Sequence, residues 1–558
     1  SLSTVHLAFE GIRARVQAPG TAAAAASVGF ASPMLKVLPR DVPVTPTVGD
    51  GLAVSLARNE RESFQVVVLP RGQAMQGVSV RVGALTNAQG QTLDAAGVTA
   101  APVGYVQTKA DPPYRSPYVG WWPDPILDFL PAVDIAKWDA QAFWVRIKAA
   151  PEQPAGIYAG TLQVCTGNAV LFRFGLSVRV YDFAVPAASP LPLAITFWPE
   201  DHPLATNAAE QKGWRNQPDY PINAWKSHKE RWADFLADYY ITFDSLYAYK
   251  DWSPDFDVLA RLQQQGRLGR FNLGYYGKAT DTDANDWGMA DTVARLRPRY
   301  ERAKQLGLLD HAYIYGCDEN PKEAFPGVER AAAVLKQAFP DVLVLTTTYD
   351  DSFGMGSVVK SMDAWCPLTP KFDPAKAAVA RAAGRQVWWY ICCGPHHPHA
   401  NLFVEYPAIE GRLLMGALTA KYRPDGFLYY QISIWNSRKP IDSGPFTDWD
   451  PRSWTTYHGD GSWTCVGPGG TPLATIRLEN FRDGLEDYAY VLALEAAVAR
   501  VEATVAERAA KADWLAQAKA ALVVPDTLAK SHTEYTGDPV AVYAWRNRIA
   551  ELIEAARP

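Results

Sequence analysis

The chain has 558 residues, of which 48% are hydrophobic, and a formal net charge of −5. A length of this order suggests two to four domains at roughly 150 residues each, or fewer if one of them is an α/β barrel. The slightly acidic balance gives no electrostatic reason to expect a nucleic acid or an anionic membrane as partner, and no apolar run approaches the ~20 residues that span a bilayer.

Cysteine content and the start of the sequence bear on cofactors and location. Six cysteines in so long a chain do not indicate a disulfide scaffold, and no CxxC pair suggests a zinc site. No cofactor and no metal ion is therefore expected. The adjacent Cys392 and Cys393 are interpreted as two small strand residues that face opposite sides of a sheet. The sequence does not begin with Met, which is compatible with removal of a signal peptide or with a cloning boundary, and we predict a secreted or periplasmic protein.

Residues 1–187 are predicted to form an antiparallel β-sandwich. Short alternating runs such as "AVSLARNERESFQVVVLP" and "GIYAGTLQVCTG" are separated by Gly, Pro, Asn and Asp and show no helical periodicity. The alanine-rich stretch 21–30 is predicted to be a loop or a flexible arm. The stretch 186–197 is interpreted as a linker that runs into the next domain.

Residues 188–470 are predicted to form a (β/α)8 barrel of the TIM type. Strands that are apolar at nearly every position alternate with amphipathic helices, as in a parallel sheet buried on both faces. The expected strands lie within 191–198, 241–247, 270–277, 311–319, 342–350, 363–370, 386–394 and 425–435, and the expected helices include 228–240, 289–307, 327–340 and 407–423. Residues 471–558 are predicted to be a helical segment that packs on the barrel.

Two adjacent carboxylates, Asp318 and Glu319, follow the fourth expected strand in "YIYGCDENPKE". Catalytic groups of such barrels lie at the carboxyl ends of the strands. A retaining glycosidase usually needs two carboxylates about 5 Å apart on opposite sides of the bond, yet the seventh expected strand, "QVWWYICCGP", carries none. The adjacent pair therefore favours substrate-assisted catalysis, in which the 2-acetamido oxygen of the sugar attacks the anomeric carbon. Asp318 would orient and stabilise the acetamido group, and Glu319 would act as acid and then as base, with retention of configuration.

Aromatic and polar residues near the other expected strand ends are candidates for sugar binding, because flat amphipathic rings suit sugar clefts as well as large cores. The candidates are Trp198, Tyr247, Tyr275, Tyr349, Asp350, Trp389, Tyr390, His396, Gln431 and Trp435. Structural alternatives stay open: Trp389, Tyr390 and Trp435 suit core packing equally, and Asp350 suits a turn. Asp318 also suits a helix cap. The histidines at 396–399 are expected to bind sugar hydroxyls or face solvent rather than hold a metal.

The chain resembles glycoside hydrolase family 123 and the related domain-of-unknown-function family 4091. The segments that carry the resemblance are "YIYGCDE", "ARNERESFQVVV", "WWYICCGP", "NLFVEYPAIEGRLL", "DGFLYYQISIWN" and "GDGSWTCVGPGGTPLATIRLENFRDGLEDYAYV". It covers about residues 50–500 and implies a β-sandwich followed by a catalytic barrel. It also implies an exo-acting β-N-acetylgalactosaminidase with a glycan or glycolipid substrate, and places Asp318 and Glu319 in the family's catalytic positions. The acidic residues of "RLENFRDGLEDYAY" are expected to form structural ion pairs.

Two alternatives to this function remain. One is a glycosidase of the same fold that acts on a sugar without an acetamido group, in which Glu319 is the acid and Asp201, Asp244 or Asp350 is the base or nucleophile. The other is a non-catalytic glycan-binding protein. The intact pair disfavours the second alternative, because a binding module has no need of a proton donor.

Overall fold

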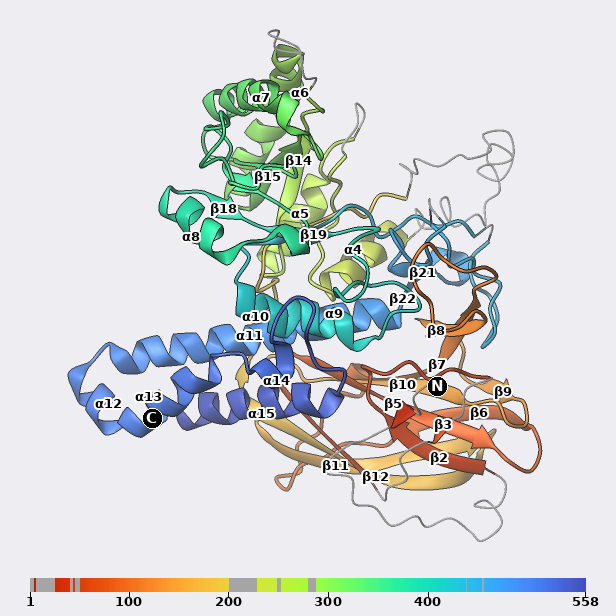
Figure 1. Ribbon diagram of the computed structural model, residues 1–558. Helices are drawn as coiled ribbons and strands as arrows, with labels where there is room; N and C mark the ends of the chain where they lie inside the picture. Colours follow the sequence, from red (N-terminus) through yellow and green to blue (C-terminus); the bar gives the residue numbers. More distant parts are fainter. Residues whose placement is uncertain are drawn as a thin grey trace.

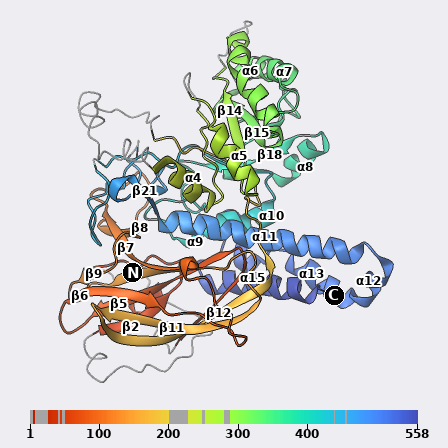
Figure 2. The same ribbon diagram turned by 180° about the vertical axis from the view of Figure 1, so that it is seen from behind.

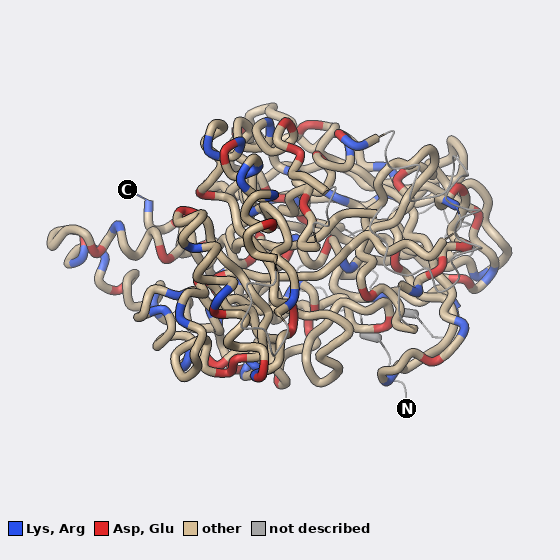
Figure 3. Tube along the Cα trace, turned by 90° about the horizontal axis from the view of Figure 1, so that it is seen from above, with Lys and Arg blue, Asp and Glu red and all other residues tan. Residues whose placement is uncertain are grey.

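A computed structural model describes residues 5–6, 26–40, 44–45, 51–199, 228–247, 252–279, 288–437, 439–453 and 456–557. A β-rich N-terminal region, a region of parallel strands and helices, and a helical C-terminal region pack together, with the long helix α11 (Ile476–Glu502) between the first two (Figures 1 and 2). Basic and acidic residues are interspersed along the trace (Figure 3). Within the described residues, no helix is both long and apolar enough to cross a membrane.

Two five-stranded sheets form the β-rich region, with strand orders β2-β5-β10-β7-β8 and β4-β12-β11-β6-β9. Alternate residues of β5, Phe64, Val66 and Val68, lie in the core between the sheets, whereas Val67 belongs to the core shared with the rest of the molecule. The strands are β1 (Val5–His6), β2 (Ala26–Ala31), β3 (Val44–Thr45), β4 (Gly51–Arg58), β5 (Arg61–Pro70), β6 (Met75–Val82), β7 (Val98–Gln107), β8 (Trp121–Ile126), β9 (Val133–Ile135), β10 (Gln141–Lys148), β11 (Gly156–Thr166) and β12 (Ala169–Ala184).

Two details of this region differ from the expectation. The second half of the alanine-rich stretch is a strand, because β2 pairs with β5 and buries Val28 and Phe30 in the core between the sheets. The pairing is also not antiparallel throughout, since β12 pairs with β4 in parallel. The apolar residues from Ala26 onward therefore form a strand, even though they directly follow a run of alanines.

The parallel strands form two sheets, β14-β15-β16-β17-β18 and β13-β20-β19, in place of the single closed ladder that was expected. Only Trp388 separates β18 from β19, and its N–H donates to the carbonyl of Trp365 at 2.7 Å. The strands are β13 (Leu193–Ile195), β14 (Phe271–Tyr275), β15 (Ala312–Gly316), β16 (Leu343–Thr346), β17 (Ala364–Trp365), β18 (Gln386–Val387), β19 (Trp389–Ile391) and β20 (Phe427–Tyr429).

The expected second strand, 241–247, is not a strand in the structure. Its main chain accepts at Asp244 O from Phe197 N–H at 2.9 Å, and Ile241 N–H donates back to the carbonyl of Leu236 at 2.9 Å. The Asn272 amide donates to the carbonyls of Ser245 and Leu246 at 2.9 Å each. Side chains therefore take the place of ladder hydrogen bonds here, and the described strands do not close into an eight-stranded barrel.

Helices flank the parallel strands and make up the C-terminal region (Figure 1). Those of the parallel region are α4 (Lys229–Ala237), α5 (Phe256–Gln264), α6 (Met289–Gln305), α7 (Phe325–Ala338), α8 (Pro374–Ala382), α9 (Ile409–Leu413), the π-helical turn η6 (Leu414–Leu418) and α10 (Thr419–Tyr422). After β21 (Thr464–Val466) and β22 (Pro472–Ala474) come α11, α12 (Val505–Ala510), α13 (Ala512–Ala521), α14 (Asp526–Ala529) and α15 (Pro539–Ala555). The predicted helical C-terminal segment is thus confirmed.

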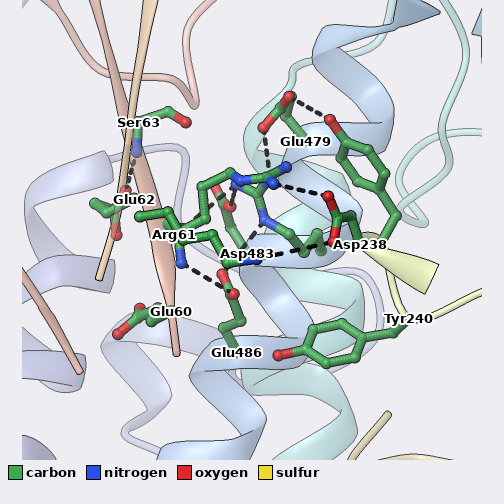
Figure 4. Close-up of polar contacts among 12 residues, drawn as sticks. Glu60, Arg61, Glu62, Ser63, Asp238, Tyr240, Glu479, Asp483 and Glu486 are labelled. Carbon is green, nitrogen blue, oxygen red and sulfur yellow. Dashed lines mark hydrogen bonds and ion pairs between the residues drawn. The ribbon is translucent and has the colours of Figure 1, made fainter. Parts of the chain in front are cut away.

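Buried ion pairs connect α11 to the β-rich region (Figure 4). Arg146 of β10 donates to Glu479 of α11 at 2.6 Å. Arg412 of α9 contacts both Asp487 of α11, at 2.7 Å, and Glu62 of β5, at 3.2 Å. Burial alone would raise the pKa of Glu479, but the guanidinium groups of Arg146 and a neighbouring arginine lower this pKa to about 2. The prediction that the acidic residues of this helix form structural ion pairs is confirmed.

Candidate active site

The loop after β15 presents the two adjacent carboxylates at the carboxyl end of the parallel strands. Cys317 and Glu319, on either side of Asp318, both have φ of 50°, which residues other than glycine seldom adopt. A Cβ at the preceding Gly316 would lie 2.6 Å from the ring of Tyr276, so the chain needs glycine there. Backbone strain of this kind is tolerated only where the surroundings fix the chain, and it gathers at functional sites.

Three consecutive threonines, 346–348, hold this loop in place. The first and third hydroxyls donate to the carbonyl of Cys317 at 3.0 and 2.9 Å. The middle hydroxyl, of Thr347, accepts from the N–H of Glu319 at 3.0 Å and donates to Asp318 Oδ1 at 3.1 Å. These threonines were not among the predicted site residues, although three hydroxyls at the end of the strand next to the carboxylates were the available signal.

Tyrosine hydroxyls donate to both carboxylates. Tyr315 donates to Asp318 Oδ1 at 2.6 Å, and Tyr390 donates to Glu319 Oε1 at 2.6 Å. Burial raises the pKa of Asp318 above its ordinary value; the Tyr315 bond works against this rise, whereas the charge of Glu319 adds to it. Burial likewise raises the pKa of Tyr390, with the neighbouring Glu319 second. Tyr390 is therefore a neutral hydrogen-bond donor at ordinary pH.

An aromatic floor lies beside Asp318. The ring centroids of Tyr247, Tyr275 and Tyr315 are 5.7 to 5.9 Å apart in each pair. Burial and then the charge of Asp318 raise the pKa of Tyr247, which also hydrogen-bonds to Tyr315. Tyr349, whose side chain is 51% exposed, hydrogen-bonds to Glu319 from the outer side. Four of the predicted sugar-binding residues, Tyr247, Tyr275, Tyr349 and Tyr390, thus surround the carboxylates.

The two predicted tryptophans Trp389 and Trp435 lie in the core instead. Trp389 is fully buried, with its ring 5.5 Å from that of Phe372. Trp435 is 1% exposed and packs on Trp232, with ring centroids 5.5 Å apart. Successive strand residues point to opposite faces, so Tyr390 faces the carboxylates and its neighbour Trp389 faces the helices. In the structure these two tryptophans are therefore core residues, as the alternative interpretation expected, and not sugar-binding residues.

Asp350 is held within a turn. Its Oδ1 accepts from the N–H and hydroxyl of Ser352 at 2.8 and 2.6 Å, and its Oδ2 accepts from the N–H of Gly354 at 3.0 Å. Burial would raise the pKa of Asp350, but the hydrogen bonds from Ser352 and its neighbours lower it below the ordinary value. Both oxygens are therefore used by the turn.

The remaining predicted binding residues are partly or fully buried at strand ends. Gln431 donates to the carbonyl of Trp198 at 3.1 Å, which joins the chain after β20 to the chain after β13. The Nε2 atom of His396 lies 2.9 Å from Cys393 O and 3.1 Å from the hydroxyl of Tyr457. These contacts place His396 beside the loop that follows β19.

The other two carboxylates considered as base or nucleophile differ in position. Asp244 is 2% exposed and accepts from Tyr313 OH at 2.6 Å and from the N–H groups of Ser245 and Asn272 at 2.8 and 2.9 Å. Burial raises its pKa to about 6. It therefore serves the irregular segment 241–247. Asp201 lies outside the described residues.

Cys392 and Cys393 do not face opposite sides of a sheet, so that interpretation is wrong. Their sulfur atoms are 3.9 Å apart and both side chains are partly exposed. The reason is that β19 ends at Ile391 and the chain turns directly after it. Cys392 packs against the side-chain cluster that contains Tyr390.

Comparisons with known proteins agree on one family. The sequence model of the glycoside hydrolase 123 catalytic domain matches residues 280–494, and that of the glycoside hydrolase 123 N-terminal domain matches residues 52–166, together more than half of the chain. No curated protein matches the sequence. A solved family 123 glycoside hydrolase from Clostridium perfringens, described in work on glycolipid glycan hydrolysis, is similar in structure with a TM-score of 0.67. The alignment has 12% identity and covers 95% of this chain and 98% of that one.

A second solved structure, a family 39 glycoside hydrolase from Bacteroides cellulosilyticus, is much less similar. It aligns with a TM-score of 0.30 and 11% identity over 74% of this chain and 81% of that one.

Proposed function

We propose that this chain, which belongs to glycoside hydrolase family 123 and is a glycosidase, removes β-linked N-acetylgalactosamine from the ends of glycans. The observation that carries the proposal is the Asp318–Glu319 pair on its pinned loop, with a tyrosine donor on each carboxylate. The Clostridium perfringens enzyme described in work on glycolipid glycans supports a glycan or glycolipid as substrate.

In the proposed mechanism the substrate supplies its own nucleophile. The acetamido oxygen attacks the anomeric carbon while the glycosidic bond breaks, and Glu319 gives its proton to the leaving oxygen. Asp318, held by Tyr315 and Thr347, stabilises the positive charge on the resulting oxazolinium ring. Water then attacks the anomeric carbon, Glu319 takes the proton back, and the acetamido group is restored with net retention.

The positions of the other carboxylates support this mechanism over one with a protein nucleophile. Asp244 is buried behind Tyr313, and both oxygens of Asp350 are engaged in a turn. The carboxylate oxygens of Asp244 and Asp350 are therefore not available to attack an anomeric carbon that lies next to Glu319. A glycosidase that acts on sugars without an acetamido group would need a second carboxylate within reach of that carbon.

We also propose that the parallel strands, with β18 and β19 counted as one, and segment 241–247 occupy the eight positions of a TIM-type barrel. One core cluster gathers side chains from these positions, as the interior of such a barrel does: Ala194, Leu246, Tyr313, Tyr315, Leu345, Ala364, Cys366, Trp388, Tyr390 and Leu428. Domain limits of 1–187, 188–470 and 471–558, and a secreted or periplasmic location, are part of the same proposal.

The test is hydrolysis of matched aryl β-glycosides with and without the 2-acetamido group. We expect the wild type to cleave only the acetamido sugars. The Asp318→Asn and Glu319→Gln variants should each lose at least about a hundredfold in kcat. A thiazoline analogue of the intermediate should inhibit the wild type. Cleavage of plain glycosides, or an active Asp318→Asn variant, contradicts the mechanism. Selective cleavage of acetamido sugars other than the galacto isomer contradicts only the sugar assignment.

A further inference from the structure

A cavity of about 820 Å³ lies between the start of β8 and the described part of the chain that follows β20. Its walls come from two regions of the chain that are more than three hundred residues apart, Gln107–Trp121 of the β-rich region and Asn436–His458. A volume of this size accepts a sugar residue or two. None of the steps proposed above uses it.

The imidazole of His458 is fixed in one orientation at the cavity wall. Glu405 accepts from the hydroxyl of Tyr114 on Oε2, at 2.6 Å, and contacts His458 Nδ1 with Oε1. A carboxylate only accepts, so Nδ1 carries the proton and donates it. The other nitrogen, Nε2, makes no hydrogen bond to any residue in the described part of the chain, and His458 is 3% exposed and lines the cavity. It is therefore positioned for a hydrogen bond with a ligand hydroxyl.

Four charged groups of the cavity wall are paired with one another, and the other two, Lys109 and Asp111, carry opposite charges. Arg452 makes a two-pronged contact with Asp450, at 2.6 to 3.2 Å, and Lys439 lies 3.1 Å from Asp448. Because these charges offset each other, the wall offers hydrogen-bond donors and acceptors without a strong net charge. Trp121, only partly buried, meets Phe446 edge to face with ring centroids 5.0 Å apart. An indole beside neutral polar groups is suited to the apolar face and hydroxyls of an uncharged sugar.

A chain of contacts joins the cavity to the carboxylate site. Tyr457, the neighbour of His458, hydrogen-bonds to His396, which in turn contacts the carbonyl of Cys393. The next residue back, Cys392, packs against the cluster that contains Tyr390, the donor to Glu319. These contacts link the cavity wall, through the loop after β19, to the tyrosine that donates to Glu319.

We propose that this cavity binds an uncharged sugar residue of the leaving group, beyond the bond that is cleaved. An enzyme that removes a terminal sugar leaves the rest of the glycan outside its catalytic pocket, and this cavity is a polar site, linked to the carboxylates by the contacts above, that is able to hold it. The inference rests on the proposed function, because it assumes that the bond is cleaved next to Glu319.

The kinetic test compares two substrates, aryl β-N-acetylgalactosaminide and β-N-acetylgalactosaminyl-lactose. Trp121→Ala should lower the ratio of kcat/KM for the trisaccharide to kcat/KM for the aryl glycoside by about tenfold, since stacking on an aromatic ring contributes roughly 1 kcal/mol or more. The matched control is Trp138→Ala, a 60% exposed tryptophan of the β-rich region outside the cavity, which should leave the ratio unchanged. A ratio that Trp121→Ala leaves within twofold of the wild type overturns the proposal.

A binding test separates this proposal from the catalytic one. Lactose, the product without the terminal sugar, is titrated calorimetrically into the Glu319→Gln variant, and into the same variant carrying one of two cavity-wall changes, Trp121→Ala or Asp448→Asn. We expect measurable binding that both changes weaken. No binding of lactose, or binding that neither change alters, overturns the proposal. If the wild type fails to cleave the aryl glycoside, the proposed function fails, and the lactose titration still decides whether the cavity takes a sugar.

Discussion

The hydroxyl of Tyr315 opposes the effect of burial on the pKa of Asp318. Tyr315→Phe removes one of the two hydroxyl donors to Oδ1. That bond lowers the pKa of Asp318, so its loss raises the pKa further, and the acid limb of the kcat/KM profile should move up by about one pH unit. Activity requires the ionised form, because Asp318 stabilises a positive charge.

The control for this change is Tyr276→Phe, whose hydroxyl donates to the carbonyl of Leu345 at 3.3 Å and touches neither carboxylate. Its acid limb should stay with that of the wild type. An unshifted limb in Tyr315→Phe contradicts the role given to Asp318.

Asp244 predicts a pH dependence of stability rather than of activity. Its pKa in the folded state is about 6, above the ordinary value for an unfolded chain. The stabilisation it contributes is full below pH ~4 and is lost as the pH rises through 6, a change on the order of 3 kcal/mol. Asp244→Asn, which keeps an acceptor for Ser245 and Asn272, should flatten this slope in chemical unfolding measured between pH 4 and 7. A slope equal to that of the wild type would refute the assignment.

Residue patterns located the adjacent carboxylates after β15, because an apolar run marks the strand and its end marks the edge of the sheet. They did not distinguish Tyr390 from Trp389, since either of two neighbouring aromatics can face inward until the register is known. The threonines at 346–348 also read as ordinary strand residues, and their hydrogen bonds depend on how β16 lies beside β15.

At the scale of elements, α11 and the α9–η6 helix touch through glycines. A Cβ at Gly484 would lie 2.5 Å from the carbonyl of Arg412, and one at Gly416 would lie 3.2 Å from the carbonyl of Gly484. Gly484→Ala should therefore push the helices apart and lower the free energy of unfolding by about 1–3 kcal/mol, despite the higher helix propensity of alanine. Gly537→Ala, with no atom within 4 Å of the added carbon, should change it little. Equal stabilities of the two variants, measured by urea unfolding, would contradict this close contact.

The sequence predicted the order of strands and helices well where apolar runs are regular, and failed at 241–247. That segment has the composition of a strand, but Asp244 and the Asn272 amide occupy the positions of ladder hydrogen bonds. Long-range side-chain bonds of this kind leave no periodic signal in a single segment. For the same reason the sequence does not reveal the cavity beside β8, whose walls are remote in the chain.

At the scale of the whole molecule, buried ion pairs make the β-rich region and α11 one cooperative unit. Arg477 of α11 donates to both oxygens of Asp124 of β8, at 2.7 and 2.8 Å, and is 3% exposed. Asp124→Ala leaves a buried guanidinium without its carboxylate and should lower stability by about 3–5 kcal/mol, still in a single calorimetric transition. Glu534→Ala, which breaks the exposed pair with Lys530, should leave stability nearly unchanged, because solvent screens such a pair. Separate transitions for the two regions would show that they fold independently.

The same buried network couples folding of the chain to proton uptake. Burial raises the pKa of Glu60, Asp483 and Glu486 even though arginines lie beside them. The folded state therefore keeps protons on these carboxyl groups at pH values where an unfolded chain has released them. Unfolding near pH 6, below the pKa of about 7 of Asp483 in the folded state, thus delivers protons to the buffer, and the measured heat of unfolding includes the heat with which that buffer takes them up.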